Sequence, residues 1–242
     1  MTNKLSYNVF AQYYDAVMGS RKNDIARVKS LVKHRAPKAK TLLELGCGTG
    51  AVLEGFTNKY SATGVDLSKS MLRIARQRLP TVTFKQADMS RYKSKEMVDV
   101  VLCLFDTINH LRSFSDWSRL FKNVGSILTT KGIFIFDINT IDRLESLSTW
   151  GPMATYFSKD DFVVMRVTKT KRKRFSWDIR IFEQSRPGRY SSHREIIEEI
   201  SFPIEEICLE LNRWFSRVEL FNPEGKPVGR DAQGRVFFVC HR

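Results

Sequence analysis

From residue 41 onward, short apolar runs alternate with longer stretches in which apolar residues recur three and four positions apart. The runs predict β-strands, and the longer spacing is typical of helices that pack one face on a sheet. The five runs are 41–45, 62–66, 82–86, 98–105 and 133–138. Strand and helix in strict succession predict a parallel sheet with helices on both faces.

Two of the predicted helices have clear signals. Ser68 is a favourable N-cap for a helix whose apolar face includes Met71 and Ala75 and which ends before Pro80. A second apolar stripe begins at Trp117 and continues to residue 128. Further helices are predicted at 7–18, 24–35 and 51–58.

After residue 150 the pattern shifts to strict alternation. Phe175, Trp177 and Ile179 alternate with polar residues, which predicts a half-buried antiparallel strand. The predicted strands of this part are 161–167, 175–184 and 190–201, followed by a helix at 203–212 and strands at 217–221 and 236–240. We therefore predict one domain made of 1–149 with 202–242, and an antiparallel insertion at 150–201.

A glycine-rich segment, LLELGCGTG at 42–50, follows the first strand. Glycine is needed where a chain turns sharply and its backbone approaches a ligand, and the residues that follow offer free N–H groups to it. Such a loop is ambiguous by itself. With Asp66 twenty residues after Gly46, it also fits a dinucleotide-binding site. A nicotinamide-dependent oxidoreductase is therefore an alternative at this point.

Polar residues stand where successive predicted strands end. Glu44 precedes the glycines, Asp66 ends the second strand, Asp88 ends the third, and Asp106 follows the fourth. Open parallel sheets bind ligands at these carboxyl ends. A carboxylate at Asp66 can accept hydrogen bonds from both hydroxyls of a ribose, and Asp88 can accept one from an adenine amino group.

Together these motifs resemble the class I S-adenosylmethionine-dependent methyltransferases. LLELGCGTG, GVDLSKSML, QADM and GIFIFDINT match that family's motifs in order and spacing, over about residues 5–145, and the final VFFVCHR is similar to its closing hairpin. The resemblance implies a Rossmann-like, doubly wound, mostly parallel seven-stranded sheet. It also implies methyl transfer from S-adenosylmethionine. The oxidoreductase alternative, by contrast, leaves Glu44 and Asp88 unexplained.

The resemblance implies roles for individual residues. Asp66 would hold the ribose, Asp88 the adenine edge, and Tyr14 the cofactor carboxylate. The full set of expected cofactor contacts is Tyr14, Glu44, Gly46, Cys47, Gly48, Gly50, Asp66, Leu67, Met71, Asp88, Met89, Leu104 and Phe105.

Asp106, Asn109 and His110 are the candidate catalytic residues, because they follow the fourth strand, where this family contacts its acceptor. The methyl donor arrives activated, so alignment is the main task, and a base is needed only if the acceptor must lose a proton. Tyr14 and Asp137 are further candidates for such a base. A carboxylate at Asp106 could align an amine and accept its proton, which favours nitrogen over oxygen as the acceptor atom.

The predicted insertion is similar to the small sheet that covers the acceptor in glycine N-methyltransferases and in N-methyltransferases of amino-sugar nucleotides. A small-molecule acceptor is therefore expected. The chain carries 40 Lys and Arg against 26 Asp and Glu, a net charge of +14, which favours an acceptor bearing phosphate or carboxylate. The alternative is an RNA-directed methyltransferase that uses the basic segment 166–194, although no Asn/Asp-Pro-Pro-aromatic motif follows the fourth strand.

The remaining composition excludes several classes. Hydrophobic residues make up 42% of the chain, which excludes a disordered protein, and no apolar run approaches the roughly 20 residues of a membrane span. The four cysteines lack metal-ligand spacing, so no metal site is expected. They show no disulfide framework either, so we expect a reducing, cytoplasmic location. A cofactor-binding protein without catalytic activity remains an alternative.

Overall fold

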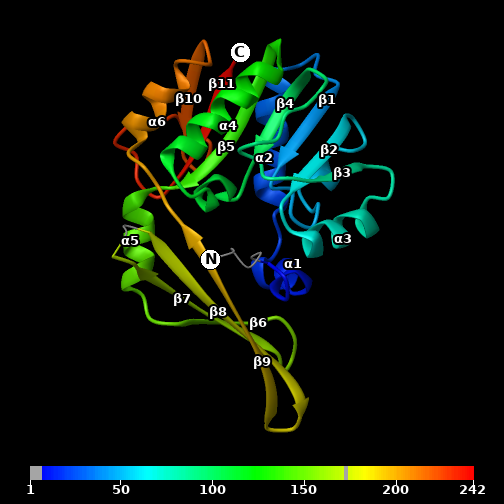
Figure 1. The fold of residues 1–242 in the computed structure, drawn as a ribbon, viewed down its shortest axis with the longest axis vertical. Coiled ribbons are helices and arrows are strands. Elements are labelled where there is room, and N and C mark those ends of the chain that lie inside the picture. Colours follow the sequence, from blue (N-terminus) through cyan, green and yellow to red (C-terminus); the bar gives the residue numbers. More distant parts are fainter. Residues whose placement is uncertain (1–6, 172–173) are drawn as a thin grey trace.

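The structure is a computed structural model that describes residues 7–171 and 174–242. Its core is a seven-stranded sheet with the strand order β10-β11-β5-β4-β1-β2-β3 (Figure 1). Strands β1 to β5 run parallel, and β11 pairs antiparallel with both β5 and β10. The strands are β1 (Thr41–Leu45), β2 (Ser61–Asp66), β3 (Thr83–Gln86), β4 (Val98–Cys103), β5 (Leu128–Asn139), β10 (Arg217–Phe221) and β11 (Arg235–His241). The predicted α/β class and sheet are confirmed.

Helices cover both faces of this sheet because neighbouring strand residues bury opposite sides. Helices α4 (Phe114–Ile127) and α6 (Ile204–Leu211) pack against one set of strand side chains, including Leu43 and Val101. Helix α2 (Lys22–Arg35) packs on the other face, against the set that includes Leu42 and Val100.

One of the predicted helices begins as expected, and two others differ from the structure. Helix α3 (Lys69–Arg78) begins as predicted, with the Ser68 hydroxyl accepting the N–H of Met71 at 3.2 Å. The segment 51–58 forms only one 3₁₀ turn, Leu53–Gly55, because Gly55 is a poor helix former. The predicted helix 7–18 is divided into a 3₁₀ turn, η1 (Phe10–Gln12), and α1 (Tyr14–Met18), and aromatic residues of this segment pack on the second sheet.

That second sheet is antiparallel, with the order β6-β7-β8-β9. Its strands are β6 (Met153–Tyr156), β7 (Phe162–Lys169), β8 (Phe175–Arg186) and β9 (Arg189–Glu199), all inside the insertion proposed from the sequence. Neither β6 nor helix α5 (Ile141–Thr149), which packs against β7, was predicted. Figure 1 shows the sheet beneath the seven-stranded core, beside α1, with the β8–β9 hairpin projecting away from the core.

The four cysteines, Cys47, Cys103, Cys208 and Cys240, are buried and form no disulfide. Among the described residues, none of the helices has the length and apolar character that crossing a membrane requires. The cytoplasmic location stays a prediction.

Candidate active site

A cavity of about 750 Å³ opens at the carboxyl ends of β1 to β4. The N-terminal segment and strand β9 of the second sheet contribute to its wall through Tyr7, Tyr14, Ile196 and Ile197. Nine of the thirteen expected cofactor residues line it: Tyr14, Gly46, Gly48, Asp66, Leu67, Met71, Asp88, Met89 and Phe105. Most of the residues expected from the sequence to contact the cofactor therefore lie around one cavity.

The glycine loop forms one edge of this cavity. Gly46 and Gly48 have φ angles of +69° and +51°, which favour glycine. A Cβ atom on Gly46 would lie 2.1 Å from the side chain of Thr107. The loop is held to β2, because the N–H groups of Gly46 and Cys47 donate to the Val65 carbonyl at 2.7 and 3.0 Å. Gly46 is thus required by both its conformation and its close contact.

Asp66 fixes two backbone segments around the cavity. One carboxylate oxygen accepts the N–H of Gly48 and the other that of Ser68, each at 2.8 Å. Burial raises the pKa of Asp66, and these backbone N–H groups partly oppose that rise. A carboxylate has about four acceptor positions. Asp66 therefore retains acceptor capacity toward the cavity that it lines.

A second acceptor, Asp88, lies in the loop that follows β3. Its Oδ1 accepts both the N–H and the hydroxyl of Ser90, at 2.9 and 2.8 Å. Leu67, Met71 and Met89 supply apolar surface to the same cavity. A planar ring with a hydrogen-bonding edge matches this combination of groups.

Glu44 lies behind the glycine loop, with only 2% of its surface exposed. Its Oε2 has no hydrogen-bond partner among the described residues, and burial raises its pKa to about 8. The Nη2 atom of Arg21 is also buried without a partner in the described chain. The Arg21 guanidinium lies 4.7 Å from the ring centres of both Tyr14 and Phe105. Buried polar atoms without partners are costly, so a ligand with an ammonium and a carboxylate group fits this part of the molecule.

The chain leaves β4 through two residues in the left-handed conformation. Phe105 and Asp106 have φ angles of +60° and +49°, unusual for residues with side chains. Both N–H groups donate to the carboxylate of Asp137, at 2.7 and 3.0 Å. Asp137 is fully buried and bound to Arg235 at 2.7 Å. Asp137 therefore holds the strand end in place instead of facing an acceptor as a base.

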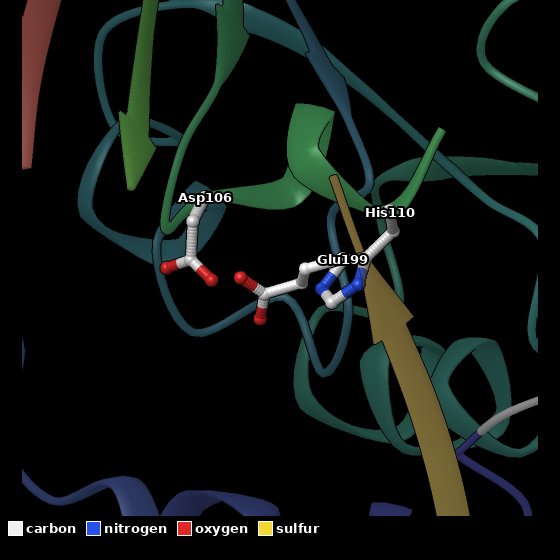
Figure 2. Close-up of side chains that lie close together, drawn as sticks. All are labelled: Asp106, His110 and Glu199. Atoms are coloured by element: carbon white, nitrogen blue, oxygen red, sulfur yellow. The ribbon is translucent and has the colours of Figure 1, made fainter. Parts of the chain in front are cut away.

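His110 lines the cavity, and Asp106 and Glu199, which are not among its lining residues, come together with it (Figure 2). One ligand atom from each lies within 4.8 Å of the others, a grouping that could also hold a metal ion. In Figure 2 the carboxyl groups of Asp106 and Glu199 point toward one another, and the His110 ring lies next to Glu199. Burial and the neighbouring Asp137 raise the pKa of Asp106 to about 7. Burial lowers the pKa of His110.

Asn109 has a structural role here. It is fully buried, and its Nδ2 donates to the carbonyls of Asn139 and Ile200, at 3.0 Å each. Its Oδ1 accepts the N–H of Asn139 at 3.1 Å. The amide thereby joins the end of β5 to the end of the second sheet. Because the Asn109 amide is fully buried and its hydrogen bonds go to backbone groups, Asn109 is a structural residue and not a catalytic one.

Four expected cofactor residues do not line the cavity. Glu44, Cys47 and Leu104 are buried, each 5% exposed or less. Gly50 packs against helix α3, where a Cβ atom added to it would lie 3.4 Å from the Cβ of Ala75. For Cys47, Gly50 and Leu104 this placement means support of the cavity wall instead of direct contact.

Sequence analysis missed three residues: Tyr7, Arg21 and Glu199. The Tyr7 hydroxyl lies 3.3 Å from Nε2 of His110, and Tyr7 lines the cavity. The carboxylate of Glu195 on β9 accepts the N–H groups of Tyr7, Val9 and Phe10 and so holds this segment on the second sheet. No local pattern marked these residues, because long-range contacts alone bring them to the site.

Comparison with known proteins agrees with this architecture. The profile of a family described as "Methyltransferase domain" matches residues 42–132. A protein of Geobacillus sp. (strain WCH70), provisionally named a methyltransferase, is 23% identical over 247 residues, covering 98% of this chain and 100% of the relative.

A second relative is a dTDP-4-amino-2,3,4,6-tetradeoxy-D-glucose N,N-dimethyltransferase of Saccharopolyspora spinosa. It is 35% identical over 132 residues, covering 52% of this chain and 53% of the relative. The match thus spans about half of that enzyme.

Two solved structures share the fold over nearly the whole chain. An S-adenosylmethionine-dependent methyltransferase from Clostridium acetobutylicum ATCC 824 superposes with a TM-score of 0.83 at 22% identity, covering 97% of this chain and 98% of the other. CalS10, an amino pentose methyltransferase from Micromonospora echinaspora solved with its cofactor bound, gives 0.78 at 23% identity, with both chains fully covered.

The sheet order, the glycine loop and the strand-end carboxylates define a class I methyltransferase fold. Residues 42–132 match the methyltransferase-domain family, and the chain is an S-adenosylmethionine-dependent methyltransferase with S-adenosylmethionine as its methyl donor.

Proposed function

We propose that this enzyme methylates an amine nitrogen of a small molecule that also carries an anionic group. The observation that carries the proposal is the carboxyl group of Asp106, which lies close to His110 and Glu199 on a backbone that Asp137 holds just after β4. A carboxylate there can orient an amine and take up its proton.

The residues present fit the methyl donor. We assign Asp66 to the ribose hydroxyls and Asp88, with Leu67, Met71 and Met89, to the adenine. Glu44 and Arg21, which have buried polar atoms without partners, would bind the ammonium and carboxylate groups of the methionine part. When bound, the donor supplies a methyl group already activated on a sulfonium.

Basic residues at the cavity support an anionic acceptor. Arg91 and Arg112 line it on the side of the loops after β3 and β4. Guanidinium groups bind phosphate and carboxylate through paired N–H donors. Relatives point the same way, since several are N,N-dimethyltransferases of dTDP-linked amino sugars. A malonyl-[acyl-carrier protein] O-methyltransferase of Bacillus cereus, 32% identical over 139 residues, is the counterexample that makes oxygen the alternative.

The test compares amines with their hydroxyl counterparts. Nucleotide-linked amino sugars and small amino acids are incubated with methyl-labelled S-adenosylmethionine, each beside the analogue in which a hydroxyl replaces the amine. We expect label only in amines, and loss of transfer in Asp106→Asn with S-adenosylhomocysteine binding retained. Transfer to a hydroxyl acceptor, unaffected by that substitution, would refute the proposal.

The RNA-directed alternative loses support from the structure. Arg180 and Arg194 both bind Asp178, and Lys169 and Arg174 pair with Glu145 and Glu198. Paired charges contribute less to the binding of a polyanion. Residues 172 and 173 of the basic segment 166–194 lie outside the described residues.

A further inference from the structure

We propose that Glu199, contributed by the second sheet, is a positioning residue that shares one proton with Asp106, so that the pair faces the reacting amine with a single negative charge. This inference rests on the proposed function, because it concerns the same acceptor. It explains why a residue of the inserted sheet reaches the end of a core strand.

Geometry brings the two carboxyl groups together. Glu199 ends β9 with 3% of its surface exposed, and one of its carboxylate oxygens lies within 4.8 Å of one from Asp106. Asn139 donates to its Oε2 at 3.4 Å. Two carboxylates this close in a buried site do not both ionise, because their charges repel and water is excluded. One proton between them removes the conflict.

The acidities agree with this arrangement. Burial raises the pKa of Glu199 well above its usual value, and the nearby Asp106 raises it further. Burial and Asp137 raise the pKa of Asp106 to about 7, whereas Glu199 lowers it. The first proton lost by the pair near neutral pH therefore leaves one negative charge.

A proton fits this pair better than a metal ion. Both ring nitrogens of His110 lie 3.3 Å from other groups, the Tyr7 hydroxyl and the Glu198 carbonyl. Two guanidinium groups also act on the pair and would repel a divalent cation. The charged and titratable groups that face it are Tyr7, Tyr14, His110, Asp137, Arg143 and Arg235.

The pair has a defined part in the chemistry. As the N–C bond forms and the C–S bond breaks, positive charge passes from sulfur to nitrogen. The singly charged pair stabilises that charge and then accepts the N–H proton, so that both carboxyl groups are protonated and the product amine is neutral. The pair returns the proton to solvent when the product leaves. Glu199 acts through Asp106 by setting its charge.

The test needs no acceptor. Sinefungin is a cofactor analogue in which a carbon bearing a protonated amine replaces the methyl-bearing sulfur, so its amine occupies the place of the transferred group. S-adenosylhomocysteine lacks that amine. The dissociation constants of both ligands are measured by calorimetry between pH 5.5 and 8.5, and their ratio reports how strongly the site prefers the amine.

For the unaltered enzyme we expect the preference for sinefungin to rise at least roughly tenfold as the pH passes 7, since a charge-assisted hydrogen bond forms. In Glu199→Gln the rise moves to higher pH, because the protonated carboxyl group of Glu199 lowers the pKa of Asp106 and an amide is a weaker hydrogen-bond donor to the Asp106 carboxylate. Glu199→Asp keeps a carboxyl group and retains the original midpoint. In Asp106→Asn the preference stays low throughout. The control Glu183→Gln, the same exchange on β8 away from the cavity, keeps the original profile.

Different results would contradict the shared proton, the position of the pair and the proposed function. An unchanged midpoint in Glu199→Gln would overturn the shared proton, and so would a preference that depends on added Mg²⁺ or is lost with a chelator. A preference independent of pH in every variant would show that the pair does not face the transferred group. The proposed function would fail separately, if Asp106→Asn still methylated the amine acceptor.

Discussion

Replacing Glu44 with glutamine is expected to stabilise the protein without cofactor and to weaken cofactor binding. Glu44 is 2% exposed, its Oε2 has no partner among the described residues, and its pKa is about 8 against an ordinary 4.5. Burial is the main cause, with Asp66 adding to it and Arg21 opposing it. Glutamine keeps the shape and removes the group that must be protonated or left unpaired.

The sign follows from proton linkage. A pKa raised on folding means that the folded state binds the Glu44 proton more tightly, so stability is greatest below pH 4.5 and falls as the pH rises toward 8. At about 1.4 kcal/mol per pH unit, the loss is about 3 kcal/mol at pH 7 and about 1 kcal/mol at pH 5. Glu44→Gln lacks this loss. Its advantage over the unaltered protein should thus be about 2 kcal/mol larger at pH 7 than at pH 5.

Thermal unfolding without ligand at the two pH values checks this. For a chain of this size the difference corresponds to roughly 4–8 °C in melting temperature. Glu54→Gln, which alters an exposed carboxylate nearby, is the control and should show no such difference. Calorimetry with S-adenosylhomocysteine should show at least roughly tenfold weaker binding to Glu44→Gln, because the ligand's ammonium loses a charged partner. An advantage equal at both pH values would refute the reasoning.

Two further substitutions test the framework around the site. Asp137→Ala leaves Arg235 without its buried partner and two backbone N–H groups without an acceptor, so urea unfolding should show a loss of roughly 3–5 kcal/mol; a loss below about 1 kcal/mol would contradict this role. Gly46→Ala places a Cβ 2.1 Å from a neighbouring threonine and should reduce S-adenosylhomocysteine affinity more than tenfold, whereas Gly151→Ala, with open space around it, should not. Equal affinities in these two variants would show that the loop tolerates the contact.

Local patterns were sufficient for the core of the fold. The run at 41–45 became β1 with the same bounds, because its three leucines fill both buried faces of a central strand. Ser68 was recognisable as a cap from its own chemistry and that of the residues that follow. Glycines and strand-end carboxylates were found for the same reason, since their roles depend on chain position.

The acceptor side was less predictable. Asn109 stands four residues from Phe105, but the left-handed conformation of Phe105 and Asp106 redirects the chain and turns the Asn109 amide inward. Glu199 lies in an alternating strand where nothing distinguishes it from solvent-facing acids such as Glu198. Pairing between β9 and the rest of the second sheet determines its place, and such contacts over long chain distances leave no local signature.

The attachment of the N-terminal segment to Glu195 affects how the enzyme should be produced. Three backbone N–H groups, of Tyr7, Val9 and Phe10, share that one carboxylate, so this segment belongs to the cavity wall. Removing the residues that precede residue 11 would keep all seven core strands but would remove Tyr7 from beside His110. A purification tag is better placed after Arg242, where the chain leaves a strand already paired on both sides.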